Sequence, residues 1–248
     1  MADHVLKRFD EELNKLRYRL VKMGTLVQQQ IELAVSALLN DNSEQAKLVL
    51  SLEDKVDKLD IKIDKQCLRI FALHQPVAMD LRLVLSAVSM NDNMELIGDL
   101  ASNVANNVLA LKASPGLIKK TKLEEMGRTL GQIISKLMDS FVNFDIELAI
   151  ESIKMDAEIN NLFKENFKLL TDIMKTDGSL IDSCCLLLDI NRNIQAISRQ
   201  AISIAQELVF LVEARLIKHQ NIDDLKTLET EDLNSQTDND DVNELIEE

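Results

Sequence analysis

The sequence predicts an all-α protein built from two tandem three-helix bundles, and three observations lead to this fold class. The 248 residues include only 6 Gly and 2 Pro, so the chain has few breakers and must run in long regular elements. The apolar residues are mainly Leu, Ile, Ala and Met, without β-branched residues alternating at period two, which favours helices over strands. The second half of the chain also repeats the pattern of the first half.

Short polar or proline-containing breaks bound the predicted helices. We expect helices over 4–39, 43–73 and 76–113, and again over 122–144, 146–175 and 180–219. Ser43 is the expected N-cap of the second helix, because its hydroxyl can accept a hydrogen bond from the first helical turn. Pro76 is expected in the first turn of the third helix, where its missing N–H breaks no helical hydrogen bond.

The internal repeat has an offset of 103 residues through the second helix of each set and an offset of 100 in the third helix. A connection that is three residues shorter in the second set explains the change. The pairs at offset 103 include Ala46 with Ala149, Glu53 with Asp156, Val56 with Ile159 and Asp57 with Asn160; those at offset 100 include Ile97 with Ile197 and Ala101 with Ala201. The predicted repeats are residues 1–114 and 115–219.

The net charge of −14 is concentrated in a C-terminal tail, residues 220–248. This segment has eleven acidic residues and one lysine, a charge of −10, which leaves about −4 for the rest of the chain. The tail lacks an apolar face, so we expect it to be disordered. An acidic chain is a poor ligand for nucleic acid or for an anionic membrane leaflet, so we expect no nucleic-acid partner and no membrane insertion.

The compartment indicated by the sequence is the cytoplasm. The first 13 residues are charged and lack the apolar core of a signal peptide. No stretch approaches the roughly 20 apolar residues of a membrane span. The three cysteines show neither a disulfide framework nor a zinc-ligand spacing, and we expect them to pack in the core.

Two acidic stripes are the candidate functional residues of the first repeat. Within each stripe the residues recur at about one helical turn, so their oxygens project from one helix face. The stripes comprise Glu53, Asp57, Asp60 and Asp64 on the second helix, and Glu95, Asp99 and Asn103 on the third. The alternative interpretation is that they are solvated surface, because charged residues are mostly exposed.

The register of the two helices favours a site over plain surface. The midpoint of Glu53 and Asp57 and the centre of the stripe on the third helix both lie about 30–35 Å from the turn at Gln75 and Pro76, at the same level of an antiparallel hairpin. Gly98, within the second stripe, would allow the helices to approach closely. Four carboxylates at one level repel unless a proton or a cation intervenes. Oxygen ligands without His or Cys favour iron(III), Mn²⁺, Mg²⁺ or Ca²⁺ over zinc.

Two segments of the chain resemble motifs of the PhoU family. Residues 75–82 (QPVAMDLR) resemble the QPxAxDLR motif that opens the third helix of these proteins, and residues 95–103 (ELIGDLASN) resemble their ERIGDxAxN motif. The resemblance covers about residues 5–219 in order. It implies two three-helix bundles and a negative regulator of the phosphate-starvation response, which links a phosphate ABC transporter to a sensor histidine kinase. The acidic motifs of the family bind multinuclear metal clusters, so the resemblance also implies metal ligands at Glu53, Asp57, Glu95 and Asp99, with Asn103 adjacent. From the oxygen ligands we expect iron or Mn/Mg as the metal.

The second repeat departs from this motif. Its third helix reads QAISRQAIS over 195–203, and the guanidinium of Arg199 cannot act as a metal ligand. We expect Arg199 to replace the metal by pairing with Asp156, with Gln195, Asn160 and Ser203 completing a hydrogen-bonded cluster. Metal binding is therefore predicted in the first repeat only.

Three functions are compatible with the sequence, and we favour a signalling adaptor that is not an enzyme. The alternatives are a metal-dependent hydrolase or oxidase that uses the carboxylates, and a purely structural bundle. Against the enzyme, no Glu-x-x-His motif and no phosphate-binding glycine loop is present. The sequence does not decide whether the chain forms a homodimer.

Overall fold

The computed structural model describes residues 2–111 and 115–215, and within these residues the chain forms helices and no strand. The predicted all-α fold class is confirmed. The described residues belong to one compact unit. The predicted tail, residues 220–248, lies outside the described residues.

Six long helices account for most of this unit, and they match the six predicted helices in order. Two short turns of helix, α4 and the 3-10 helix η1, were not predicted. The long helices are α1 (Ala2–Asn40), α2 (Ser43–His74), α3 (Ala78–Ala110), α5 (Leu123–Asn143), α6 (Ile146–Thr176) and α7 (Ile181–Glu213); the short ones are α4 (Pro115–Ile118) and η1 (Gly178–Leu180).

The N-terminus of α2 is capped by Asn42 and not by Ser43, so the predicted cap is wrong by one residue. The Asn42 Oδ1 accepts hydrogen bonds from the backbone N–H groups of Glu44 and Gln45, each at 3.1 Å. These are two of the donors that the first turn of a helix leaves without an intrahelical partner. Asp145, 103 residues later, caps α6 in the same way. The repeat therefore extends to the caps.

Two predicted helix ends also differ from the structure. Helix α3 begins at Ala78, so Pro76 precedes the helix instead of lying in its first turn. Helix α7 ends at Glu213, where Ala214 has a left-handed backbone with φ 59°, and not at His219 as predicted. The last buried residue of α7 is Leu211, so the helix ends within one turn of its last buried side chain, and packing supplies most helical stability in proteins.

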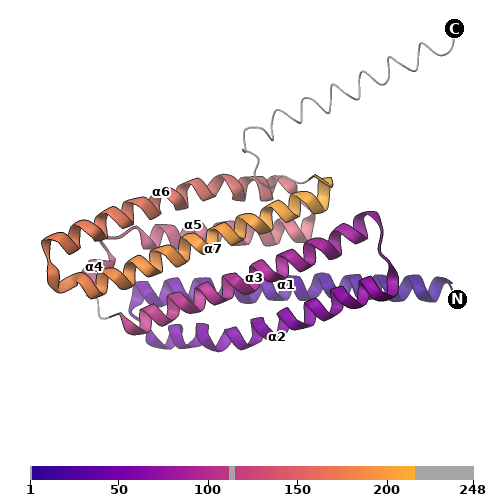
Figure 1. Ribbon diagram of the computed structural model, residues 1–248, viewed down its shortest axis with the longest axis horizontal. Helices are drawn as coiled ribbons and strands as arrows, with labels where there is room; N and C mark the ends of the chain where they lie inside the picture. Colours follow the sequence, from indigo (N-terminus) through magenta and orange to yellow (C-terminus); the bar gives the residue numbers. More distant parts are fainter. Residues whose placement is uncertain (1, 112–114, 216–248) are drawn as a thin grey trace, which may run out of the picture. The chain divides into compact units, whose positions relative to one another are not determined.

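The helices pack as two three-helix sets that meet along α3 and α7 (Figure 1). The α3–α7 interface is the most extensive in the protein, and α1 and α5 form a second contact between the sets. Helices α2 and α6 pack mainly against helices of their own set. In the described residues no helix is both long and apolar enough to cross a membrane.

Two glycines allow α1 and α5 to approach closely. A Cβ atom added at Gly127 of α5 would lie 2.5 Å from Cγ1 of Val35 on α1, and a Cβ atom at Gly24 of α1 would collide with Met138 on α5. Gly24 and Gly127 are 103 residues apart, and so are Val35 and Met138. The same contact therefore occurs twice, in opposite senses, as expected for two repeats related by a local twofold axis.

Candidate functional site

An acidic band runs along the groove between α2 and α3. We define it as Glu53, Asp57, Asp60 and Asp64 on α2 with Asp92, Glu95 and Asp99 on α3. The antiparallel packing of the two helices places the predicted stripes side by side: Ser102 of α3 contacts Glu53, and Asn91 of α3 contacts Asp60. The band lies wholly within the first repeat.

Glu53 is the most enclosed carboxylate of the predicted set. Its Oε2 accepts hydrogen bonds from the Ser102 hydroxyl and, at 2.8 Å, from Nε2 of Gln30 on α1. Its Oε1 is buried without a hydrogen-bond partner among the described residues. Burial raises the pKa of Glu53 to about 7, and the neighbouring Asp99 adds to the increase, while the bonds from Ser102 and Gln30 oppose it. Glu53 therefore holds a proton more readily than a solvated carboxylate.

Gly98 gives this part of α3 room to approach α1 and α2. A Cβ atom at Gly98 would lie 3.1 Å from Oε1 of Gln30 and 3.3 Å from Cγ1 of Val56. Both distances are tighter than ordinary van der Waals contact. The close helix approach expected at Gly98 is confirmed, and it brings the Glu53 carboxylate into a cluster of three helices.

The other predicted ligands are more exposed. Glu95 is half-buried, whereas Asp57, Asp99 and Asn103 are exposed. Burial and then the charges of Asp99, Asp60 and Asp57 raise the pKa of Glu95. The negative field of the band therefore acts on Glu95 from both helices. Asn103 lies one turn beyond Asp99, at the end of the band.

The tightest convergence of carboxylates among the described residues lies about two to three turns nearer the α2–α3 connection than Glu53. One oxygen each of Asp60, Asp64 and Asp92 falls within 4.8 Å of the others. We call these three residues the aspartate triad. Asp60 and Asp64 are half-buried, and Asp92 is exposed. Burial, followed by the charge of Asp64, raises the pKa of both Asp60 and Asp92.

A buried amide supports the aspartate triad. Asn91 is fully buried, and its Nδ2 donates to Oδ1 of Asp60 at 2.7 Å and to Oδ1 of Asp64 at 3.0 Å. The Oδ1 of Asn91 is buried and has no partner among the described residues. A cation bound at the triad would favour the reverse orientation of this amide, with the oxygen turned toward the carboxylates. This donor set, three carboxylates beside an amide, fits a hard cation.

The equivalent of Glu53 in the second repeat is Asp156. Its cluster includes Asn160 and Gln195, as predicted, but Ser198 takes the place predicted for Arg199. Oδ1 of Asp156 accepts from the Ser198 hydroxyl, and Oδ2 accepts from Nδ2 of Asn160, each at 2.6 Å. Gln195 joins the cluster by donating to Asn160 at 2.7 Å. Arg199 is exposed and forms no ion pair within the described part of the chain, so the predicted Arg199–Asp156 pair is wrong.

Ser203 also stays outside this cluster, because its hydroxyl donates to the Arg199 carbonyl one turn earlier in its own helix. The physical reason for both corrections lies at residue 198. The glycine of the first repeat, Gly98, is replaced here by a buried serine whose hydroxyl reaches the carboxylate directly. Arg199, one residue along, therefore turns toward solvent, where a guanidinium keeps its hydration.

The aspartate triad has no acidic counterpart in the second repeat. The repeat offsets align Asp60 with Phe163, Asp64 with Phe167 and Asp92 with Arg192. The two phenylalanine rings lie 6.5 Å apart between centroids, which is within the range of favourable aromatic pairs. The second repeat therefore carries no carboxylate at any of the three triad positions.

The amide beside the triad is retained in the second repeat but has a full set of partners there. Asn191, the equivalent of Asn91, donates to the Phe163 carbonyl at 3.0 Å and accepts from Asn166 at 3.0 Å. In the first repeat the position of Asn166 is occupied by Ile63. The unpartnered oxygen of Asn91 is therefore particular to the repeat that carries the acids.

Sequence reasoning missed four residues around the band: Gln30, Asn91, Asp92 and Ser102. Asp92 could have been found, because it is three residues before Glu95 and so lies on the same helix face. Ser102 has the same relation to Asp99. Gln30 comes from α1, and a pattern confined to the α2–α3 hairpin carries no signal for it.

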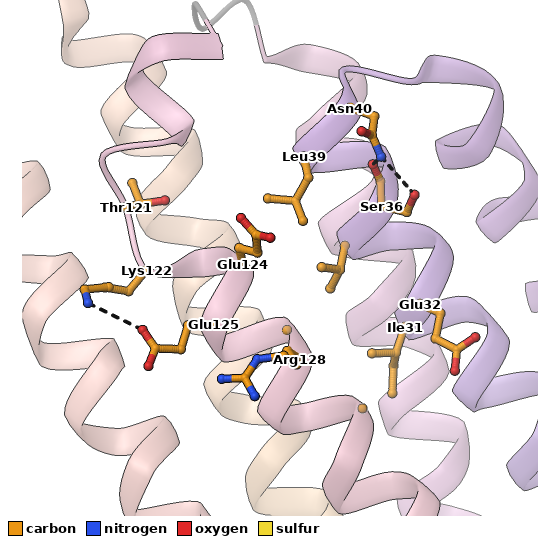
Figure 2. Close-up of a pocket in the computed structure, with 13 residues that line it drawn as sticks. Ile31, Glu32, Ser36, Leu39, Asn40, Thr121, Lys122, Glu124, Glu125 and Arg128 are labelled. Carbon is orange, nitrogen blue, oxygen red and sulfur yellow. Dashed lines mark hydrogen bonds and ion pairs between the residues drawn. The ribbon is translucent and has the colours of Figure 1, made fainter.

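A separate recess lies between the end of α1 and the start of α5 (Figure 2). It encloses ≈ 670 Å³ and is lined by apolar side chains of α1 together with charged side chains of both signs. Lys122 pairs with Glu125 at 3.4 Å, as Figure 2 shows. Three carboxylates and two basic side chains line the recess, a net charge of only −1, so it presents no strong field that selects a ligand charge.

The protein is a duplicated helical bundle. Its two three-helix sets are joined along their third helices, and one α-helical hairpin carries a band of carboxylates. The comparisons with known proteins agree with this class. The PhoU domain family matches the chain twice, over residues 20–108 and 123–208. The chain therefore belongs to the PhoU family.

Individual relatives extend over most of the chain. The phosphate-specific transport system accessory protein PhoU of Serratia marcescens is 29% identical over 225 residues, covering 91% of this chain and 93% of the relative. The protein of the same name from Escherichia coli K12 is 28% identical, with the same coverage. The crystal structure of PhoU from Pseudomonas aeruginosa has a TM-score of 0.78 and 29% identity, covering 84% of this chain and 100% of that one. The phosphate transport system regulatory protein PhoU from Streptococcus pneumoniae has a TM-score of 0.76 and 26% identity, covering 85% of this chain and 99% of that one.

Proposed function

We propose that this chain is an accessory and regulatory protein of a phosphate-specific transport system. In this role it acts in the cytoplasm as a negative regulator of the phosphate-starvation response, linking a phosphate ABC transporter to a sensor histidine kinase. The observation that carries the proposal is the match of the PhoU domain to both repeats. Relatives named for phosphate transport align with about nine-tenths of the chain, which supports a role for the whole bundle.

The proposed role is that of an adaptor and not of an enzyme. The acidic band lies in a groove between two helices, and its more exposed members, Asp57, Asp92 and Asp99, open directly to solvent. A catalytic site would instead hold its reacting groups in a pocket that excludes water. Turnover of phosphoesters by the purified protein with Mn²⁺ would favour the metal-dependent hydrolase over the adaptor.

The regulatory role is tested by deleting the gene in its own host. A reporter of a phosphate-responsive promoter is expected to stay active in phosphate-rich medium in the deletion strain, and the intact gene supplied in trans should restore repression. Reporter output that stays repressed in the deletion strain would overturn the proposed role. Capture of the transporter and kinase subunits by the full chain, scored separately, tests the two proposed partners.

We also propose that the acidic band holds one or more hard cations, iron or Mn²⁺/Mg²⁺, in the first repeat. Burial raises the carboxyl pKa values along the band, and the neighbouring carboxylates add to the increase; a cation would relieve this mutual repulsion. The aspartate triad is the proposed first position, because its ligand atoms already converge. The predicted ligands Glu53, Asp57, Glu95 and Asp99 continue from it along the groove, and they would take part in binding further ions.

Titration of chelator-treated protein with Mn²⁺, followed by calorimetry, tests this proposal. Asp60→Asn with Asp64→Asn is expected to weaken Mn²⁺ binding by at least about tenfold, because two charged ligands become neutral. The matched control, Asp139→Asn with Asp182→Asn, removes the same charge from exposed positions in the second repeat and should leave binding nearly unchanged.

A second pair of variants locates the site within the band. Glu95→Ala with Asp99→Ala removes two predicted ligands outside the triad. Loss of Mn²⁺ binding in this pair alone would move the site to the predicted set, and the absence of Mn²⁺ binding to the unaltered protein would overturn the proposal. Asp156→Ala in the second repeat should leave the stoichiometry unchanged.

A further inference from the structure

A cationic recess lies between α1 and α2, on the side of α2 that faces away from the acidic band. It encloses ≈ 290 Å³, near the lower end of the size range of small-ligand pockets. Five basic side chains and one carboxylate line it, a local charge of +4 in a chain whose net charge is −14. The charged residues are Lys15, Arg19, Lys62, Lys65 and Arg69, with Glu12 as the carboxylate; the remaining lining residue is Gln66.

The floor of the cationic recess is held in place by Gln66. This side chain is only 3% exposed, and its Nε2 donates to the Glu12 carbonyl at 2.6 Å. Its Oε1 accepts from Nη1 of Arg19 at 2.5 Å. The same Nη1 donates to the Lys62 carbonyl at 2.8 Å. Arg19 is therefore positioned across the two helices before any ligand arrives, which lowers the entropy cost of binding.

The cations of this recess are only weakly neutralised by the described residues. The one ion pair among them joins Arg69 to Glu12 at 3.6 Å. The remaining donors of Arg19 have no partner among the described residues. Guanidinium groups bind phosphate oxygens in a bidentate manner, and lysines add charge without a fixed direction. The geometry thus suits a compact ligand with several phosphate groups.

The full set of five cations is found in the first repeat and not at the corresponding positions of the second. At the offset of 103, Lys15 corresponds to Ile118, Lys62 to Glu165 and Arg69 to Asp172. Three of the five cations are thus replaced by an apolar residue or by carboxylates. If the basic residues served only the general solubility or folding of a repeat, we would expect them at the same positions of both repeats. The concentration of positive charge against the overall charge of the chain points to a specific anion.

We propose that the cationic recess binds an oligophosphate anion, such as inorganic triphosphate or the phosphate chain of a nucleotide. Several linked phosphate groups would place their charges near the lysines while Arg19 and Arg69 bind the oxygens. A single phosphate could engage only part of this set. This proposal does not depend on the role proposed above or on metal in the acidic band.

The test is calorimetric titration of the full chain with inorganic triphosphate at constant ionic strength, with EDTA present to keep cations from the acidic band. Lys62→Gln with Lys65→Gln should weaken triphosphate binding by about tenfold or more, since charged hydrogen bonds are lost. The control Lys154→Gln with Lys168→Gln removes the same charge from exposed positions on α6, and binding should stay within about twofold. Far-UV circular dichroism confirms that both variants are folded.

Separate arms identify the source of the phosphate groups. Orthophosphate and sulfate should bind much more weakly than triphosphate, and phosphatidylglycerol vesicles should show no binding beyond that of phosphatidylcholine vesicles. Equal loss of affinity in the two lysine pairs would mean that overall charge alone drives binding, and this would overturn the proposal. The same holds if triphosphate does not bind, if orthophosphate binds as tightly, or if the protein binds only the anionic vesicles.

Discussion

Replacing Gly127 with alanine tests the close contact between α1 and α5. In an open helix position this substitution stabilises a protein by about 1 kcal/mol, because alanine has the higher helix propensity. At Gly127 the new Cβ atom would lie 2.5 Å from Cγ1 and 2.8 Å from Cγ2 of Val35. Valine is stiff at χ1 and cannot turn aside easily, so overpacking should cost about 1–3 kcal/mol. We therefore expect Gly127→Ala to range from neutral to about 2 kcal/mol destabilising.

Gly131, one turn further along α5, provides a matched control. A Cβ atom there would meet no atom within 4 Å, so Gly131→Ala should raise the free energy of unfolding by about 1 kcal/mol. Urea denaturation followed by circular dichroism measures both variants. Combining Gly127→Ala with Val35→Ala should recover part of the loss relative to the sum of the two single variants. If Gly127→Ala stabilises the protein as much as Gly131→Ala, the α1–α5 contact described here is wrong.

Two further predictions concern single side chains of the two repeats. The pKa of Glu53 is raised, so the stability that its protonated form contributes is present below the unfolded pKa of 4.5 and is lost as the pH rises through about 7. With EDTA present, the free energy of unfolding of the wild type should therefore fall over this pH window by on the order of 1 kcal/mol more than that of Glu53→Gln. This magnitude allows for solvent screening. A parallel pH dependence in the two proteins would refute this assignment. In the second repeat, Ser198→Ala should lower the free energy of unfolding by about 1–3 kcal/mol, because the hydrogen bond to Asp156 is lost. Arg199→Ala should change the free energy of unfolding by less than about 0.5 kcal/mol. Urea denaturation curves in which Arg199→Ala is the more destabilised variant would contradict this ranking.

The six long helices could be predicted because their signals are local. Scarce breakers, apolar periodicity and the internal repeat lie within short windows of sequence. Boundaries were less predictable where two neighbouring residues could serve the same purpose. Asn42 and Ser43 are both good N-cap residues, and the backbone geometry that selects Asn42 depends on how the chain enters the turn. The end of α7 was extended too far, because the apolar pattern alone does not reveal where burial stops.

The acidic band was predictable along each helix but not across helices. Spacing on α2 and α3 identifies the stripes, and the hairpin register places them at one level. The carboxylates converge at Asp60, Asp64 and Asp92 and not at the predicted ligands. This depends on the directions of the side chains, which cannot be predicted from residue spacing alone. The contribution of Gln30 depends on how α1 packs on the hairpin. The Arg199 hypothesis failed for a similar reason, because opposite charges in register need not face each other when a buried serine is nearer.

The reciprocal contacts Gly24–Met138 and Gly127–Val35 have a consequence for the ancestry of the chain. A contact in which residue i of one copy meets residue j of the other, and j meets i, is the pattern of an isologous homodimer. Duplication and fusion of the gene for a dimer-forming three-helix protein would produce this arrangement without inventing a new interface. Within one chain the copies are held together along α3 and α7 and along α1 and α5, and neither interface depends on the outer helices α2 and α6. One copy could then keep carboxylates at positions 60, 64 and 92 while the other acquired Phe163, Phe167 and Arg192, a divergence that identical subunits of a homodimer cannot undergo.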